Sequence, residues 1–152
     1  MRTVNVAWDR EAERFTAKGT HRGVELPINA PENEPDPSGK HRRPTGFSAT
    51  ELLLAGVASC SAWDIVEIMR KQRQQMTGLD VAVEGEQHAD PPWAYQRIAV
   101  HFTVRGHHLD EEKVRRAVRL SVDSYCSVIA SLRGAEIVDS VEIIEEGTAP
   151  VA

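Results

Sequence analysis

An apolar helix predicted over residues 47–75 constrains this fold more than any other feature. Ser48 and Glu51 stand three residues apart, which is the pattern of a capping box at the start of a helix. No charged residue occurs between Leu52 and Trp63. Since a helix that is apolar on every side needs cover all round, we expect this one to lie inside the domain. Its uncharged run of about 12 residues is shorter than the roughly 20 that a membrane span needs.

Strand patterns occur on both sides of this helix. Alternating apolar residues at 3–8 and 15–28 predict a small antiparallel meander, and those at 79–87 and 95–105 predict a hairpin. Residues 136–144 predict a last strand. The central helix should end at Thr77-Gly78.

A second helix is predicted to begin after Asp110, which can cap it, and to end at Gly134. Its apolar stripe should pack on the first helix and consists of Val114, Ala117, Val118, Ser121, Val122, Tyr125 and Ile129. Strands that group together, instead of alternating with helices, favour an α+β fold. The length favours one domain over residues 1–152.

The charge pattern and the loops narrow the function classes. The net charge of −5 comes from interspersed acids and bases, so we expect no nucleic-acid partner and no binding to membranes. The first residues become charged too early for a signal peptide, which predicts a cytoplasmic protein. The proline-rich residues 29–46 should form a surface loop that moves and gates a site.

Two cysteines carry the candidate chemistry. Cys60 lies within the first helix among small residues, and Cys126 lies at the edge of the stripe on the second helix. One interpretation treats both as small buried hydrophobic residues. In the other, the thiols face each other, and one reacts with an oxidant while the second resolves the sulfenic acid as a disulfide. The residues alone leave both open.

Other polar residues weigh less. Asp64, one turn after Cys60, is interpreted as a polar contact where the helix leaves the core, although a carboxylate near a thiol would raise the thiol pKa. His107-His108 is interpreted as a turn and not as part of a metal site, since adjacent residues point to different sides. No CxxC or histidine spacing indicates zinc, so we predict neither a metal nor a cofactor.

The run SATELLLAGVASC, followed by SAWDIVEIMRKQR and later by LSVDSYCSV, resembles the OsmC/Ohr family and within it most resembles the YhfA-like branch. The resemblance implies an intertwined α+β homodimer, with antiparallel sheets wrapped around two long central helices and a site at the dimer interface. It also implies a thiol peroxidase that reduces organic hydroperoxides in oxidative stress defence. Cys60 would be peroxidatic, Cys126 resolving, and the reductant a dithiol such as a lipoylated protein.

The residues that activate the thiolate match the family pattern less closely. In Ohr proteins a glutamate lies ten positions before the peroxidatic cysteine, whereas Glu51 lies nine positions before Cys60, about 100° away around a helix. Glu51 is therefore a candidate catalytic residue that the capping box also explains. The family's arginine has four candidates, which are Arg10, Arg14, Arg42 and Arg43. Without a cation, we expect the pKa of the Cys60 thiol to stay near or above the ordinary value.

Two functions follow from these observations. The first is a cysteine-dependent peroxidase acting on organic hydroperoxides. The alternative is a non-enzymatic module whose interface cleft binds a small apolar ligand, with cysteines that only pack or sense oxidants. Cys60→Ser separates the two, because a peroxidase loses turnover while a binding module keeps its ligand.

Overall fold

The computed structural model describes residues 3–9, 14–19, 25–28 and 47–147. The chain forms two compact units, Met1–Leu53 and Leu54–Ala152. That residues 1–152 act as a single domain stays a prediction. The proline-rich loop at 29–46, with its predicted gating role, lies outside the described residues.

The first unit contains the predicted meander. Strands β1 (Asn5–Asp9), β2 (Arg14–Lys18) and β3 (Glu25–Ile28) pair antiparallel in that order. The meander is therefore confirmed.

Helix α1 spans Ala49–Lys71 and begins at the predicted capping box. The Ser48 N–H donates to the Glu51 carboxylate at 2.7 Å, and the Glu51 N–H donates to Ser48 Oγ at 3.2 Å. The helix ends earlier than predicted, because Arg73 adopts a left-handed φ of 54°. The N–H groups of Arg73 and Gln74 then bond back to the carbonyls of Arg70 and Met69, which is a Schellman motif. Thr77-Gly78, the predicted stop, lies in the next strand.

The second helical region is interrupted, which contradicts the prediction of one helix up to Gly134. Asp110 caps α2 (Glu111–Leu120) as predicted, accepting the Lys113 N–H at 3.2 Å. The π-helical segment η1 (Ser121–Tyr125) follows, then Cys126 in extended conformation, then α3 (Ser127–Ser131). An extra residue per turn in η1 rotates the stripe, so Tyr125 is 60% exposed instead of packed.

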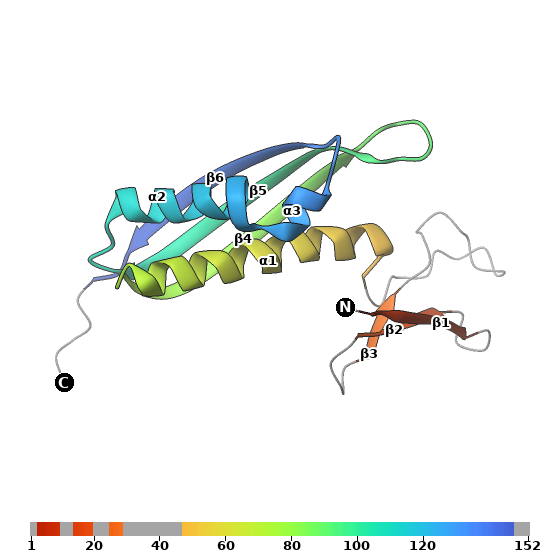
Figure 1. The fold of residues 1–152 in the computed structure, drawn as a ribbon, viewed down its shortest axis with the longest axis horizontal. Helices are drawn as coiled ribbons and strands as arrows, with labels where there is room; N and C mark the ends of the chain where they lie inside the picture. The colour runs from red at the N-terminus through yellow and green to blue at the C-terminus, as the bar shows by residue number, and fades with distance from the viewer. Residues whose placement is uncertain (1–2, 10–13, 20–24, 29–46, 148–152) are drawn as a thin grey trace. The chain divides into compact units, whose positions relative to one another are not determined.

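The sheet of the second unit contains three strands, which lie side by side in the order β4 (Gln75–Gln87), β5 (Tyr95–His107) and β6 (Glu136–Glu145). The predicted hairpin is confirmed, since β4 and β5 pair antiparallel. β6 pairs parallel to β5, because the chain crosses over through α2 and α3 before returning. The expectation of antiparallel sheets is therefore wrong for this strand pair. These helices and α1 lie along one face of this sheet (Figure 1).

The core of the second unit lies between this sheet face and the helices. Alternate β5 residues, Ile98, Val100, Phe102 and Val104, are fully buried, as the period of two in a strand requires. From the helices, Val114, Ala117 and Val118 of α2 and a stripe of α1 join them.

Only one stripe of α1 is fully buried, at the four-residue spacing of Val57, Ser61, Ile65 and Met69. The expectation of burial on every side is therefore wrong for the single chain, in which Trp63 is 66% exposed. The prediction that this helix is too short to span a membrane is also wrong, since the 23 residues of α1 would be enough to cross one by length and composition. Its stripe of core residues is what characterises α1 as a core helix.

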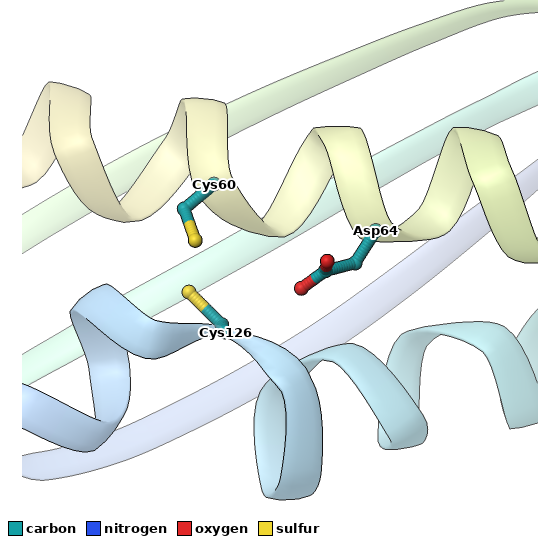
Figure 2. A group of neighbouring side chains, drawn as sticks. All are labelled: Cys60, Asp64 and Cys126. Atoms are coloured by element: carbon teal, nitrogen blue, oxygen red, sulfur yellow. The ribbon is translucent and has the colours of Figure 1, made fainter.

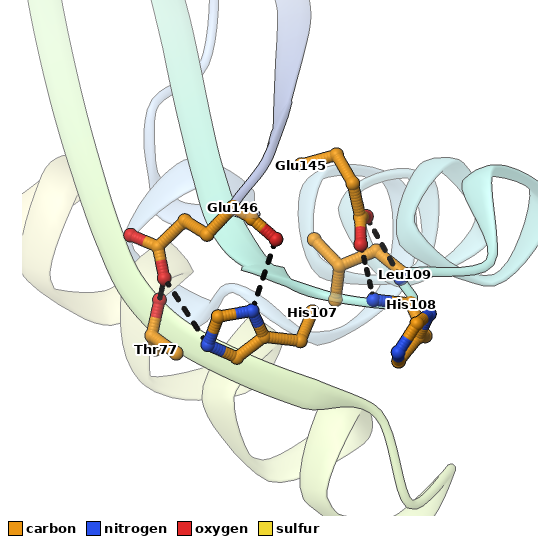
Figure 3. Close-up of polar contacts among 6 residues, drawn as sticks. All are labelled: Thr77, His107, His108, Leu109, Glu145 and Glu146. Carbon is orange, nitrogen blue, oxygen red and sulfur yellow. Dashed lines mark hydrogen bonds and ion pairs between the residues drawn. The ribbon is translucent and has the colours of Figure 1, made fainter. Parts of the chain in front are cut away.

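His107 is the last residue of β5 and only His108, with a left-handed φ of 51°, lies in the connection to α2, so the prediction of a turn holds for His108 alone (Figure 3). The N–H groups of His108 and Leu109 both donate to the Glu145 carboxylate, and these bonds hold the pKa of Glu145 below its usual value. His107 Nδ1 lies 3.0 Å from the Glu146 carbonyl oxygen. The pair thus joins the end of β5 to the end of β6.

Candidate active site

The two cysteines face each other across the helices of the second unit. Cys60 projects from the middle of α1, and Cys126 occupies the extended residue between η1 and α3. Their sulfur atoms lie within 4.8 Å of each other and point together (Figure 2). Cys60 is half-buried and Cys126 is buried, and both are free thiols. Gly56, one turn before Cys60, faces Val128 of α3, and a Cβ added there would make an ordinary contact of 3.6 Å with the Val128 side chain.

Hydrogen bonds from the start of α3 act on the Cys60 thiol. Burial raises its pKa, but the bonds together outweigh burial and leave the pKa below the usual thiol value. The bonds come from the Val128 N–H, the Cys126 thiol, the Ser127 hydroxyl and the Ser127 N–H. The Ser127 Oγ lies 3.8 Å from Cys60 Sγ. The expectation that the pKa of Cys60 stays near or above the ordinary thiol value is thus wrong. Hydrogen bonds from neighbouring residues lower this pKa, although no arginine is among the donors.

The pKa of Cys126 moves the other way. Burial raises it most, and the hydrogen bond and the charge of Cys60 raise it further. The Ile129 N–H, 3.5 Å from the sulfur, and the Ser61 hydroxyl lower it without reversing the shift. Of the two thiols, Cys60 is therefore the more easily ionised, which is the pattern that separates a nucleophile from a proton-carrying partner.

Two buried serines connect this pair to Asp64. Ser61 Oγ lies 3.5 Å from Cys126 Sγ, and the Ser121 hydroxyl donates towards the Ser61 carbonyl at 3.2 Å and the Asp64 carboxylate at 3.4 Å. Asp64 lies one turn after Cys60, so both side chains project from the same face of α1. Its carboxylate approaches to within 4.8 Å of both sulfurs. Asp64 was predicted to be a polar contact where the helix leaves the core, and Ser127 was not predicted to be a site residue.

The other predicted site residues are not part of this cluster in the described structure. Glu51 is exposed, and its hydrogen bonds to Ser48 hold its pKa below the usual value. Nine residues along a helix correspond to about 13.5 Å, so its carboxylate is tied up in the capping box well before Cys60. A catalytic role for Glu51 stays a prediction. Arg14 belongs to β2, and Arg10, Arg42 and Arg43 lie outside the described residues.

Together these features define an α+β protein with a dithiol site between α1 and the extended residue that joins η1 to α3. The family model described as OsmC-like protein matches residues 39–140. Protein YhfA of Escherichia coli K12 is 37% identical over 98 residues, which cover 64% of this chain and 73% of the relative. The chain belongs to the OsmC-like protein family.

Solved structures share the fold. A hypothetical protein from Aquifex aeolicus VF5 is 25% identical with a TM-score of 0.80, covering 97% of this chain and 98% of that chain. The OsmC-like protein from Mycoplasma pneumoniae is 16% identical with a TM-score of 0.75, covering 95% and 98%. The organic hydroperoxide resistance protein OhrB of Bacillus subtilis is 17% identical with a TM-score of 0.59, covering 94% and 97%. The predicted α+β fold of the OsmC type is thereby confirmed.

Proposed function

We propose that this protein is a cysteine-dependent thiol peroxidase that reduces organic hydroperoxides. The observation that carries the proposal is the approach of the Cys60 and Cys126 sulfurs to within 4.8 Å. A disulfide has an S–S length of about 2.05 Å, so the sulfurs need to approach by less than about 3 Å to bond. The naming of structurally similar proteins as organic hydroperoxide resistance proteins supports the choice of substrate class.

The reaction has three steps. The Cys60 thiolate attacks the terminal oxygen of the hydroperoxide, the O–O bond breaks, and the leaving alkoxide takes a proton from solvent to give the alcohol. Cys60 becomes a sulfenic acid. The Cys126 sulfur then attacks Cys60 Sγ, and water leaves with the Cys126 proton as the disulfide forms. A dithiol reductant, such as a lipoylated protein, restores both thiols by becoming a disulfide itself.

The cytoplasmic homodimer also belongs to this proposal. On α1, Leu53 is 40% exposed and Trp63 is 66% exposed in the single chain. Exposed large apolar side chains on a core helix are typical of a surface that a second protein copy covers. In the dimer, the cover from a second copy would restrict water around the site, and apolar surroundings suit an organic peroxide better than hydrogen peroxide.

Stopped-flow oxidation of the reduced protein tests the activity. With cumene hydroperoxide, wild type should lose two thiols per chain in a saturable or second-order reaction faster than with hydrogen peroxide. Cys60→Ser should abolish the reaction, while Cys126→Ser should retain the first step and lose only one thiol. Ser59→Ala, on the same helix, is the control that should leave the rate unchanged. A Cys60→Ser variant that binds an apolar probe as wild type does, beside a wild type inert to peroxide, would favour the binding module instead.

A further inference from the structure

Asp64 is the part of the site that peroxide chemistry does not use. One sulfur atom attacks the peroxide and the other resolves the sulfenic acid, so neither step needs a carboxylate. Yet the structure places one carboxylate oxygen and both sulfurs within 4.8 Å of one another (Figure 2). Within the described residues, no lysine or arginine forms an ion pair with Asp64, whose hydrogen bond to the Ser121 hydroxyl is long at 3.4 Å.

Helix α1 and the contacts of Cys126 position the three atoms. Cys60 and Asp64 are four residues apart on α1, and Cys126 is held by the Ile129 N–H and by Ser61, which is fully buried. With both sulfurs as thiolates, three negative charges would share this half-buried space. Like charges at such distances disfavour one another, and a cation placed among them turns the repulsion into attraction. The cluster therefore has the geometry and the charge of a cation site.

The donor set selects the cation. Two thiolates and one carboxylate suit a thiophilic ion such as Zn²⁺, whereas Mg²⁺ and Ca²⁺ require oxygen ligands. Zinc–sulfur bonds of about 2.3 Å in tetrahedral geometry place two sulfurs about 3.8 Å apart, so the present spacing needs a contraction of about 1 Å at most. Cys60 is half-buried, which leaves room for water as the fourth ligand.

We propose that the reduced protein binds one zinc-class divalent cation through Cys60 Sγ, Asp64 and Cys126 Sγ. Binding releases the thiol protons to solvent. This cation binding is an activity separate from the peroxidase reaction. Its consequence for regulation rests on the proposed function: the cation and the peroxide use the same sulfurs. One hydroperoxide and two protons convert the bound dithiolate into a disulfide, an alcohol, water and the free cation, so oxidation releases the ion.

Cobalt titration of the TCEP-reduced protein tests the binding. We expect one Co²⁺ per chain with an intense sulfur-to-cobalt charge-transfer band in the near ultraviolet, which ZnCl₂ abolishes by displacement. Cys60→Ser and Cys126→Ser should each remove most of that band. Asp64→Asn should weaken Co²⁺ binding by about tenfold or more. Mutation of a residue that only contacts a metal ligand already lowers metal affinity by about tenfold, and Asp64 is proposed to be a ligand itself. Glu67→Gln, a carboxylate on the next turn of α1, should bind as wild type does.

The results separate the two proposals. A wild-type protein without the charge-transfer band, or a band that persists in Cys60→Ser, overturns the metal site whatever the peroxide result. Equal affinity in Asp64→Asn and wild type removes Asp64 as a ligand and contradicts the three-ligand proposal. Cobalt binding by a protein inert to cumene hydroperoxide would sink the peroxidase and leave the metal site standing. Circular dichroism and thiol counts show that each variant is folded and reduced.

Discussion

At the scale of single residues, two identical thiols have different surroundings. Cys60 receives donors from Ser127 and Val128, while Cys126 is buried and faces the Cys60 charge. A lower pKa on Cys60 and a higher pKa on Cys126 support the proposal that Cys60 is the nucleophile and Cys126 the resolving residue.

Ser127→Ala should slow the reaction of the Cys60 thiol with an alkylating agent without unfolding the protein. Loss of one hydrogen bond to the thiolate, worth about 1 kcal/mol, should lower the iodoacetamide alkylation rate at pH 7 several-fold and move the midpoint of its pH profile upwards. The sign follows because fewer donors leave the thiolate less favoured and the fraction ionised at pH 7 smaller. Ser131→Ala, which removes a hydroxyl bonded to the Ser127 carbonyl, is the control. Equal pH midpoints in wild type and Ser127→Ala would show that the hydroxyl plays no part in lowering this pKa.

At the scale of helices and strands, local sequence patterns predicted where helices begin better than where they end. Ser48 and Asp110 cap as predicted because a capping side chain is read from a few neighbouring residues. The end of α1 depends on Arg73 in a conformation usually left to glycine, and nothing in its side chain signals it. The π-helical turn before Cys126 has no local sequence signal either. The sequence predicted that Cys60 and Cys126 could face each other. It did not predict the hydrogen-bond donors around Cys60, because their positions depend on this turn.

Arg73→Gly tests the helix end. Glycine adopts a φ of 54° without the clash of a Cβ, worth about 1–2 kcal/mol, and part of this gain is offset by the larger entropy of the unfolded chain. We expect the free energy of unfolding to rise by about 0.5 kcal/mol in urea titrations. Lys71→Gly, two residues earlier and inside the helix, should instead lower it by roughly 0.5–1 kcal/mol. If Arg73→Gly destabilises as much as Lys71→Gly, the left-handed helix end is contradicted.

At the scale of the whole molecule, the single chain leaves apolar side chains of a core helix uncovered. The sequence predicted that this helix lies inside the protein, and the isolated chain buries only one stripe of it. The proposed homodimer would cover this surface with a second copy of the chain. The family resemblance implied that homodimer, together with the roles of Cys60 and Cys126.

Trp63→Glu should weaken the proposed dimer. A charge placed at a large, buried interface side chain typically costs about 2 kcal/mol or more, so the dimer dissociation constant in sedimentation velocity should rise by at least roughly tenfold. Trp93→Glu changes a tryptophan that is also exposed, on the β4–β5 connection, and serves as the comparison. A stable folded wild-type monomer at micromolar concentration would remove the dimer from the account.

Cys60 and Cys126 are proposed to react with a peroxide as a pair. Peptide mapping under non-reducing conditions, after one equivalent of cumene hydroperoxide, tests this pairing. We expect an intrachain Cys60–Cys126 disulfide as the main product, because a sulfenic acid beside a second thiol condenses faster than it oxidises further. Sulfinic acid at Cys60 with Cys126 still a free thiol would contradict it.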